Sequence, residues 1–295
     1  MTKTAVTEAF SPERRAALNR SIRKFYDASS GLWEQVWGEH MHHGYYEPGA
    51  ARVSRRQAQI DTIDRLLDWS YDGQLDAEAI STLLDVGCGI GGSSLYLAER
   101  LAAEATGITL SPVQAERARA RAEELDLGDR AQFQVADALA MPFADNQFDL
   151  VWTLESGEHM ADKHQFLAEC QRVLKPGGRL ALATWCHREG ELNADERRHL
   201  EKIYDVYCLP YVVSLSAYEE IARSQQWQGI RTADWSEQVA PFWDVVIDSA
   251  KELFVLPRVL MAGWQTVRAT LSLRLMSRGY ARGLVKFGLL TATKP

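Results

Sequence analysis

The chain has 295 residues, of which 46% are hydrophobic and 25% charged, as in ordinary globular proteins. It contains no run of 18 apolar residues, which excludes a membrane-spanning helix, and its first 20 residues lack the apolar core of a signal peptide. The four cysteines show no C-x-x-C spacing, which indicates reduced thiols in an intracellular protein. The net charge of −7 is uneven, because residues 251–295 sum to +7 and residues 1–250 to −14.

The N-terminal part, residues 1–75, is predicted to be a helical segment that covers a ligand site. It is dense in aromatic residues between positions 25 and 46, and aromatic faces attract cations. Tyr26 and Tyr45 are the candidate contacts in this stretch. His40, His42 and His43 lack a fourth ligand and a Cys or Glu partner, so we expect no metal site.

A glycine-rich turn follows the first predicted strand, residues 82–86. The glycines run Gly87-x-Gly89-x-Gly91-Gly92, and a helical pattern begins directly after them. Such a turn lets a ligand approach backbone N–H groups at the start of a helix. The spacing differs from the G-x-G-x-x-G of dinucleotide folds and resembles the S-adenosylmethionine loop of seven-stranded methyltransferases. The residues expected to contact the cofactor here are Asp85, Gly87, Cys88, Gly89 and Gly91.

Strand and helix signals alternate from residue 81 to residue 185, which predicts a parallel sheet covered on both faces. The further strands are expected at 105–109, 132–135, 148–153 and 179–185. The helices are expected at 112–125 and 163–173, and Lys175-Pro176-Gly177-Gly178 is expected to form a turn.

Ligands of open α/β sheets bind beyond the carboxyl ends of the strands. After the third strand, Asp137 could accept a hydrogen bond from an adenine amine, beside the backbone of Ala138. The second strand ends at Thr109 without the acid that often binds ribose hydroxyls, so Thr109 or Gln114 would serve instead, next to Leu110. The missing acid also disfavours a nicotinamide oxidoreductase.

Two acids and a histidine, Glu155, Glu158 and His159, follow the fourth strand. We expect His159 to take a proton near neutral pH, with Glu158 or Glu155 orienting the imidazole and raising its basicity. All three are predicted catalytic residues, and Glu155 is also expected to contact the cofactor.

The second half of the chain interrupts the regular alternation. Residues 187–217 are predicted to be a helical cap, followed by a helix at 218–226 and a strand at 230–235. Residues 236–282 are a mostly helical insertion broken at Pro241 and Pro257, and 285–293 form the last strand. The predicted domains are therefore 1–75, 76–186, 187–217 and 218–295.

A basic stripe is predicted near the C-terminus, because Arg274, Arg278 and Arg282 recur every four residues, with Leu271, Met276 and Tyr280 beside or opposite them. This helix could lie on an anionic membrane surface, or be a lid with a solvated face. Nucleic acid is not an expected partner, because the body is acidic and carries no recognition motif.

Together the motifs resemble the gamma-tocopherol methyltransferase family. The matching runs cover nearly the whole chain and include residues 25–34, 37–46, 84–92, 108–112, 156–160, 274–280 and 283–288. The resemblance implies a Rossmann-like seven-stranded class I α/β fold with helical cap insertions and S-adenosylmethionine as cofactor.

The implied reaction is methylation of the aromatic carbon ortho to the hydroxyl of a lipophilic phenol, with gamma-tocopherol giving alpha-tocopherol. The related N-methyltransferases of indole alkaloids have similar motifs, so methylation of a small amine is the alternative. A further alternative is a protein that binds the cofactor without catalysing a reaction. The expected compartment is the plastid for a plant protein and the cytoplasm for a bacterial one, with the chain soluble or peripheral to a membrane. The sequence leaves the oligomeric state open.

Overall fold

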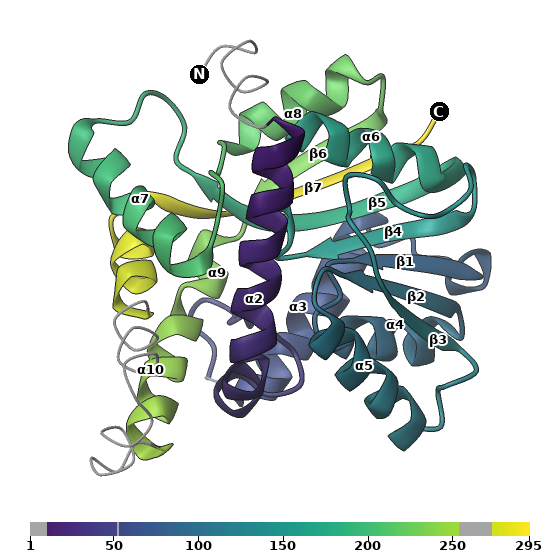
Figure 1. Ribbon diagram of the computed structural model, residues 1–295, viewed down its shortest axis with the longest axis horizontal. Coiled ribbons are helices and arrows are strands. Elements are labelled where there is room, and N and C mark those ends of the chain that lie inside the picture. Colours follow the sequence, from purple (N-terminus) through teal and green to yellow (C-terminus); the bar gives the residue numbers. More distant parts are fainter. Residues whose placement is uncertain (1–10, 52, 254–272) are drawn as a thin grey trace.

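A computed structural model describes residues 11–51, 53–253 and 273–295. Its centre is a seven-stranded sheet in the order β3-β2-β1-β4-β5-β7-β6 (Figure 1). Strands β1 to β5 pair in parallel, and β7 pairs antiparallel with both β5 and β6. The strands are β1 (Thr82–Val86), β2 (Glu104–Thr109), β3 (Ala131–Val135), β4 (Phe148–Leu154), β5 (Leu174–His187), β6 (Gln228–Asp234) and β7 (Val285–Thr293).

The sheet is covered on both faces, which explains why its central strands are apolar without alternation. In β1, Leu83 packs into one core and Leu84 into the other. One core is formed with α3 (Arg55–Ser70), α4 (Gly92–Leu101), α5 (Pro112–Glu124) and α10 (Pro241–Leu253). The other is formed with α6 (Lys163–Val173) and α8 (Leu215–Ser224).

Helix α2 (Pro12–Trp37) crosses the view between the strands and the helices α7 (Ala194–Tyr207) and α10 (Figure 1). It begins at Ser11, whose side chain accepts a hydrogen bond from the backbone N–H of Arg14. It ends at Gly38, whose φ of 84° favours glycine. The helix packs on α5 and α10 and so lies across the carboxyl ends of the parallel strands.

Most predicted elements are confirmed, and β1, α6 and β7 have the predicted limits. Strand β5 is longer than expected, because Gly177 and Gly178 exchange backbone hydrogen bonds with Lys294 instead of forming a free turn. Helix α8 begins three residues earlier than expected, where the side chain of Ser214 caps it. The predicted interruption at Pro241 is present as the start of α10. The expected break at Pro257 and the apolar Leu271 lie outside the described residues.

Candidate functional site

A deep cleft opens at the carboxyl ends of the parallel strands, with about 1310 Å³ of empty space including the part open to solvent. The loops after β1, β2, β3 and β4 form its floor, and side chains of α2 and α7 form its cover. Most of the residues expected to contact the cofactor line this cleft together with the predicted catalytic residues.

The glycine turn lies on the floor of the cleft. Gly87 has a φ of 87°, and a Cβ there would stand 2.2 Å from the Cβ of Ser156. Only glycine fits this position, and the backbone is left bare toward the cleft. Asp85 is buried beneath the turn, where burial raises the pKa of its carboxyl to about 7 against the hydrogen bond from Ser94. Cys88 is also buried in the turn, and burial raises the pKa of its thiol, so it stays protonated.

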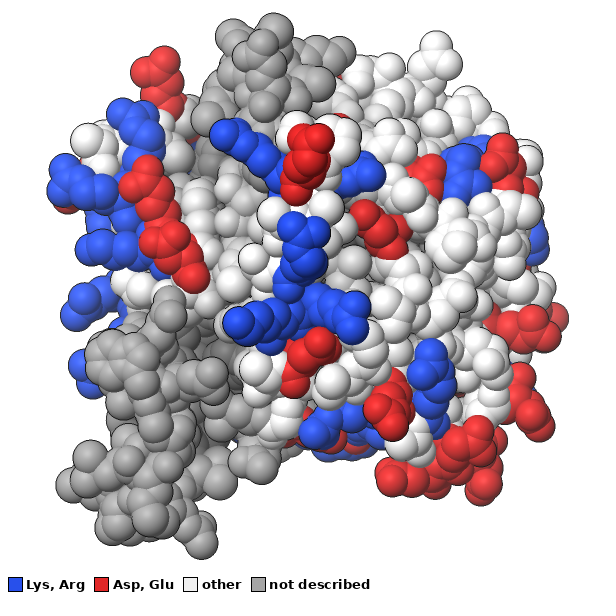
Figure 2. Space-filling view, in the orientation of Figure 1, with Lys and Arg blue, Asp and Glu red and all other residues white. Residues whose placement is uncertain are grey.

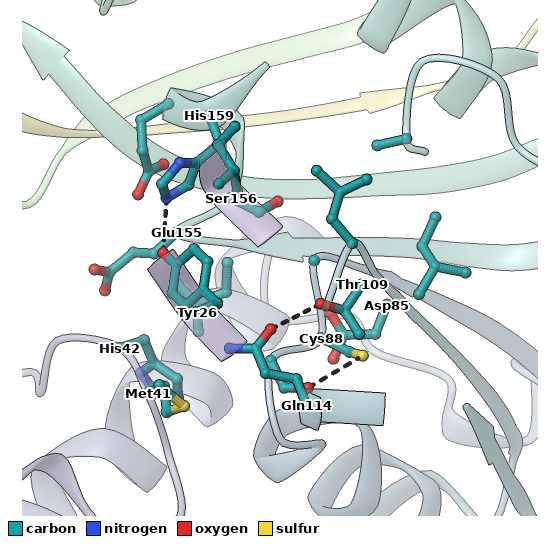
Figure 3. Close-up of a pocket in the computed structure, with 18 of the residues that line it drawn as sticks. Tyr26, Met41, His42, Asp85, Cys88, Thr109, Gln114, Glu155, Ser156 and His159 are labelled. Atoms are coloured by element: carbon teal, nitrogen blue, oxygen red, sulfur yellow. Dashed lines mark hydrogen bonds between the residues drawn. The ribbon is translucent and has the colours of Figure 1, made fainter. Parts of the chain in front are cut away.

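The side chains after β2 are held in place by hydrogen bonds among themselves. The hydroxyl of Thr109 donates to the amide oxygen of Gln114 over 2.7 Å. Because that oxygen is used, the amide nitrogen of Gln114 is the end that points toward the middle of the cleft (Figure 3). It can donate to a ribose oxygen, which is the neutral substitute that the sequence suggested. Leu110 lines the cleft beside them.

Asp137 lies after β3, at the far side of the same floor. Its carboxylate accepts hydrogen bonds from the Asn19 amide of α2, over 2.8 Å, and from the backbone N–H of Leu139, over 2.9 Å. The Asn19 contact ties α2 to the loop that also carries Ala138. This end of the cleft therefore matches the part expected to hold an adenine.

Glu158 lies in the short helix η2 (Gly157–His159) that follows β4. Its carboxylate is buried and accepts a hydrogen bond from the Thr184 hydroxyl over 2.8 Å. Burial, with the nearby charge of Glu155, raises the pKa of Glu158 to about 7. A carboxylate with this pKa is matched to taking a proton near neutral pH.

His159 lines the cleft next to Glu158, with its Nε2 atom 2.8 Å from the hydroxyl of Tyr26 on α2 (Figure 3). Burial, with the charge of Lys163, lowers the pKa of His159 to about 3. The expectation that a neighbouring carboxylate raises its basicity is therefore wrong. The imidazole is neutral at pH 7 and can accept a proton only transiently. Burial also raises the pKa of Tyr26, whose hydroxyl stays protonated.

Glu155 lines the cleft, but its carboxylate holds other parts of the protein in place. It accepts hydrogen bonds from the backbone N–H of His43, from Nδ1 of His43 at 2.6 Å and from the Trp185 indole at 3.0 Å. Burial alone would raise the pKa of Glu155, but the charge and hydrogen bonds of His43 outweigh it and the pKa is lowered. Glu155 thus fastens residues 39–46 to the end of β4, and three of its four lone-pair sites are occupied. Its expected catalytic role stays a prediction.

Two of the expected cofactor contacts lie elsewhere. Tyr45 lines a different hollow, where its ring meets Trp235 edge-on and the Arg65 guanidinium covers it. It turns away because the backbone of residue 45 pairs with α3 at Ala58. Gly91 does not line the cleft but begins α4, where a side chain would strike Phe133.

The sequence interpretation missed Lys163, a buried lysine at the start of α6. Its ammonium donates to the backbone carbonyls of Gly157, Glu158 and Met160 over 2.7, 3.1 and 2.7 Å. It therefore holds the turn that presents Glu158 and His159. Lys163 starts a helix, and a lysine at such a position is normally exposed to solvent. The local sequence pattern therefore gave no sign that this side chain is buried.

The cleft fits the cofactor that the glycine turn suggested. Bare backbone on the floor, the donor of Gln114 and the acceptor of Asp137 suit an adenosine. Aromatic rings of Tyr26, Trp185 and Tyr207 line the cleft beyond the glycine turn, and such faces favour a sulfonium cation. Among the described residues no cluster of His, Cys, Asp or Glu has the geometry to hold a metal ion.

Comparisons with known proteins agree with this geometry. Residues 84–182 match the family described as "Methyltransferase domain". A protein of Oryza sativa subsp. japonica named "Probable tocopherol O-methyltransferase, chloroplastic" is 50% identical over 285 residues, which cover 94% of this chain and 79% of the relative. Norajmaline N-methyltransferase of Rauvolfia serpentina is 32% identical over 292 residues, which cover 95% and 99% of the two chains.

Among solved structures, the geranyl diphosphate C-methyltransferase of Streptomyces coelicolor A3(2) superposes with a TM-score of 0.74 at 21% identity, covering 94% of this chain and 98% of that one. This likeness confirms the expected class I fold. The chain belongs to the tocopherol methyltransferase family, with its alkaloid N-methyltransferase relatives, and is a methyltransferase that depends on S-adenosylmethionine.

Proposed function

We propose that this enzyme methylates the ring carbon ortho to the phenol hydroxyl of gamma-tocopherol or a related tocopherol. The observation that carries the proposal is the pair of proton acceptors, Glu158 and His159, in a cleft that apolar and aromatic side chains also line. These walls include Trp37, Leu154, Met160, Trp185 and Tyr207.

The chemistry needs an electron-rich carbon held against a methyl donor. S-adenosylmethionine supplies a methyl group on a positively charged sulfur. Glu158, whose pKa of about 7 lies near the working pH, takes the phenol proton and so increases the electron density on the ortho carbon. Tyr26 and His159 close the cleft from opposite sides, which orients the ring and excludes water.

Methylation on carbon has a second demand, since the ring carbon that gains the methyl group must lose its hydrogen as a proton. Glu158, protonated in the first step, can return its proton to the phenol oxygen while neutral His159 accepts the proton from carbon, so one proton is released overall. A cationic amine acceptor also releases one proton, but an anionic site would be needed to attract it. The buried Glu155 carboxylate is already bound by the backbone N–H and by Nδ1 of His43, so it is not free to attract a cationic amine, which favours the phenol.

The test is an assay with labelled cofactor that offers gamma-tocopherol and norajmaline side by side. We expect transfer to gamma-tocopherol, with alpha-tocopherol as product rather than a methyl ether, identified by mass and retention time. Transfer to the alkaloid alone would replace the proposal by N-methylation. Tight cofactor binding without transfer to either would favour a binding protein.

We also propose that the enzyme meets an anionic membrane surface, from which a lipophilic phenol is supplied, in the plastid if the source is a plant. No helix among the described residues is long and apolar enough to cross a bilayer. Lys and Arg side chains gather at the left margin of Figure 2, on the side where Figure 1 places α7 and the helix over 273–281. In and just after that helix, Arg274, Arg278 and Arg282 are exposed.

A further inference from the structure

Residues 39–42 pass directly over the glycine turn. A Cβ on Gly92 would stand 2.3 Å from the backbone oxygen of Glu39, and one on Gly89 would lie 3.9 Å from the sulfur of Met41. The next residue, His42, is 4% exposed and lines the cleft. The segment thus brings an imidazole to the glycine end of the cleft, beside Met41 (Figure 3).

The tautomer of His42 follows from its one hydrogen bond. Its Nδ1 lies 2.9 Å from the backbone oxygen of His43, and a carbonyl oxygen can only accept, so Nδ1 carries the hydrogen. Nε2 is therefore a bare lone pair. Burial lowers the pKa of His42, which keeps the ring in this neutral form.

The Nε2 atom is buried without a hydrogen-bond partner in the part of the chain that the structure describes. An unpaired buried acceptor costs free energy and is uncommon in native proteins. Glu155, which accepts hydrogen bonds from the neighbouring His43, is itself an acceptor and cannot satisfy it. The missing partner must be a donor that enters the cleft.

The direction of the cofactor in the cleft identifies that donor. With the adenine at Asp137 and Ala138 and the ribose at Gln114, as expected from the sequence, the amino-acid part would extend over Gly87 and Gly89 toward His42. All of these residues line the same cleft. The sulfonium and the carboxylate of this part donate no hydrogen bonds, and the α-ammonium is its one donor. We propose that Nε2 of His42 accepts a hydrogen bond from the α-ammonium group of bound S-adenosylmethionine.

The inference rests on the expected orientation of the cofactor in the cleft and adds a residue that recognises it. Three ligands separate the contributions in calorimetric titrations without turnover: S-adenosylhomocysteine, its analogue lacking the α-amino group, and 5′-methylthioadenosine, which lacks the whole amino-acid end. The variant His42→Phe keeps a planar ring and removes the acceptor. His42→Gln retains an acceptor at similar reach.

We expect His42→Phe to bind S-adenosylhomocysteine at least tenfold more weakly, because a hydrogen bond to a charged donor is lost. Binding of the desamino analogue and of 5′-methylthioadenosine should stay within twofold of wild type. His42→Gln should recover most of the loss. Equal weakening of all three ligands, or no weakening of any, would overturn the inference.

The matched control is His187→Phe, since Nδ1 of His187 also bonds the carbonyl of the next residue, Arg188, but lies outside the cleft. It should leave all three affinities unchanged. Should phenylalanine prevent folding, His42→Asn, which is too short to reach the cleft, takes its place with the same expected pattern. Failure of the wild type to bind S-adenosylhomocysteine would instead contradict the dependence on S-adenosylmethionine itself.

Discussion

At the scale of single residues, the site depends on a few buried polar groups whose environment sets their charge. Glu158 illustrates this, because burial moves the pKa of its carboxyl up to about 7. The unprotonated form is the base, so kcat/KM should rise with pH through about 7 and then level off. In Glu158→Gln this rise should disappear and kcat should fall by ~10²–10⁴-fold. A pH–rate profile of both proteins checks this. If the rise of kcat/KM with pH stayed unchanged in the variant, the base would be a group other than Glu158.

The raised pKa of Glu158 also predicts how the stability of the fold depends on pH. This dependence has the opposite sign to that of the rate, because stability falls as pH rises. The folded pKa lies above the ordinary value of 4.5, so the folded state favours the protonated carboxyl. Its contribution to stability is full below about pH 4.5 and is lost as pH rises through about 7. Glu158→Gln stays neutral and should therefore melt a few °C above wild type at pH 8, with the difference shrinking toward pH 5. Melting curves at the two pH values measure it.

Lys163 is expected to act through the turn that it holds. In Lys163→Met three backbone carbonyls lose their donor, which should cost about 2–4 kcal/mol of unfolding free energy and lower kcat. Affinity for S-adenosylhomocysteine should change little, because Lys163 does not line the cleft. Denaturant unfolding, kcat and a binding titration give the three readouts.

Lys175→Met is the control for this variant. Its ammonium lies 2.8 Å from Asp149, but its side chain is 39% exposed, so the loss should stay below about 1 kcal/mol. Equal effects of the two substitutions would show that the turn does not depend on Lys163.

At the scale of elements, residues 39–46 join α2 to the sheet through one buried pair. His43 and Glu155 are both almost fully buried, and Glu155 adopts a φ of 56°, which side chains rarely tolerate. Such strain persists only where several contacts fix the residue. The position of α2 over the cleft therefore depends on a joint formed by residues 112 positions apart.

Glu155→Gln should weaken this joint, because the new amide brings a donor next to the His43 N–H groups. We expect amide hydrogens of residues 38–46 to exchange at least tenfold faster, since breaking a buried pair costs several kcal/mol. Hydrogen exchange with mass spectrometry measures it. Glu34→Gln, which breaks a half-exposed pair with Arg117 on α5, should leave this segment nearly unchanged. Comparable acceleration in both variants would contradict the role of the joint.

These elements also show how far local pattern determines the structure. Strand β1 and helix α6 have the predicted limits, because these limits are set by apolar runs, capping residues and turn residues that lie within a few positions of one another in the sequence. The cleft could be placed as well, since parallel strands end at one edge. The roles of Glu155 and Tyr45 could not, because each depends on partners brought together by folding, His43 in one case and Trp235 in the other.

At the scale of the whole molecule, the acidic body carries its basic stripe on one side. The apolar side of the helix over 273–281 is not free to enter a bilayer, because Leu273, Met276 and Tyr280 are buried in the protein. Lys286 does not extend the stripe, since it lies 3.0 Å from Asp234. Contact with a membrane would therefore be electrostatic and limited to exposed cations such as Arg274, Arg278 and Arg282.

Replacing these three arginines by glutamine tests the membrane contact. Each cation near an anionic surface contributes roughly 1 kcal/mol, so binding to vesicles with 30% phosphatidylserine, at low salt, should fall by about two orders of magnitude. The control replaces Arg100, Arg119 and Arg130, exposed cations on other elements, and gives the same change in net charge. It should bind nearly as well as wild type, and activity on detergent-dispersed tocopherol should be unaffected in both variants. Added salt should abolish wild-type binding, because the contact lacks an inserted apolar face. Equal losses in the two triple variants would show that net charge, and not this stripe, governs the association.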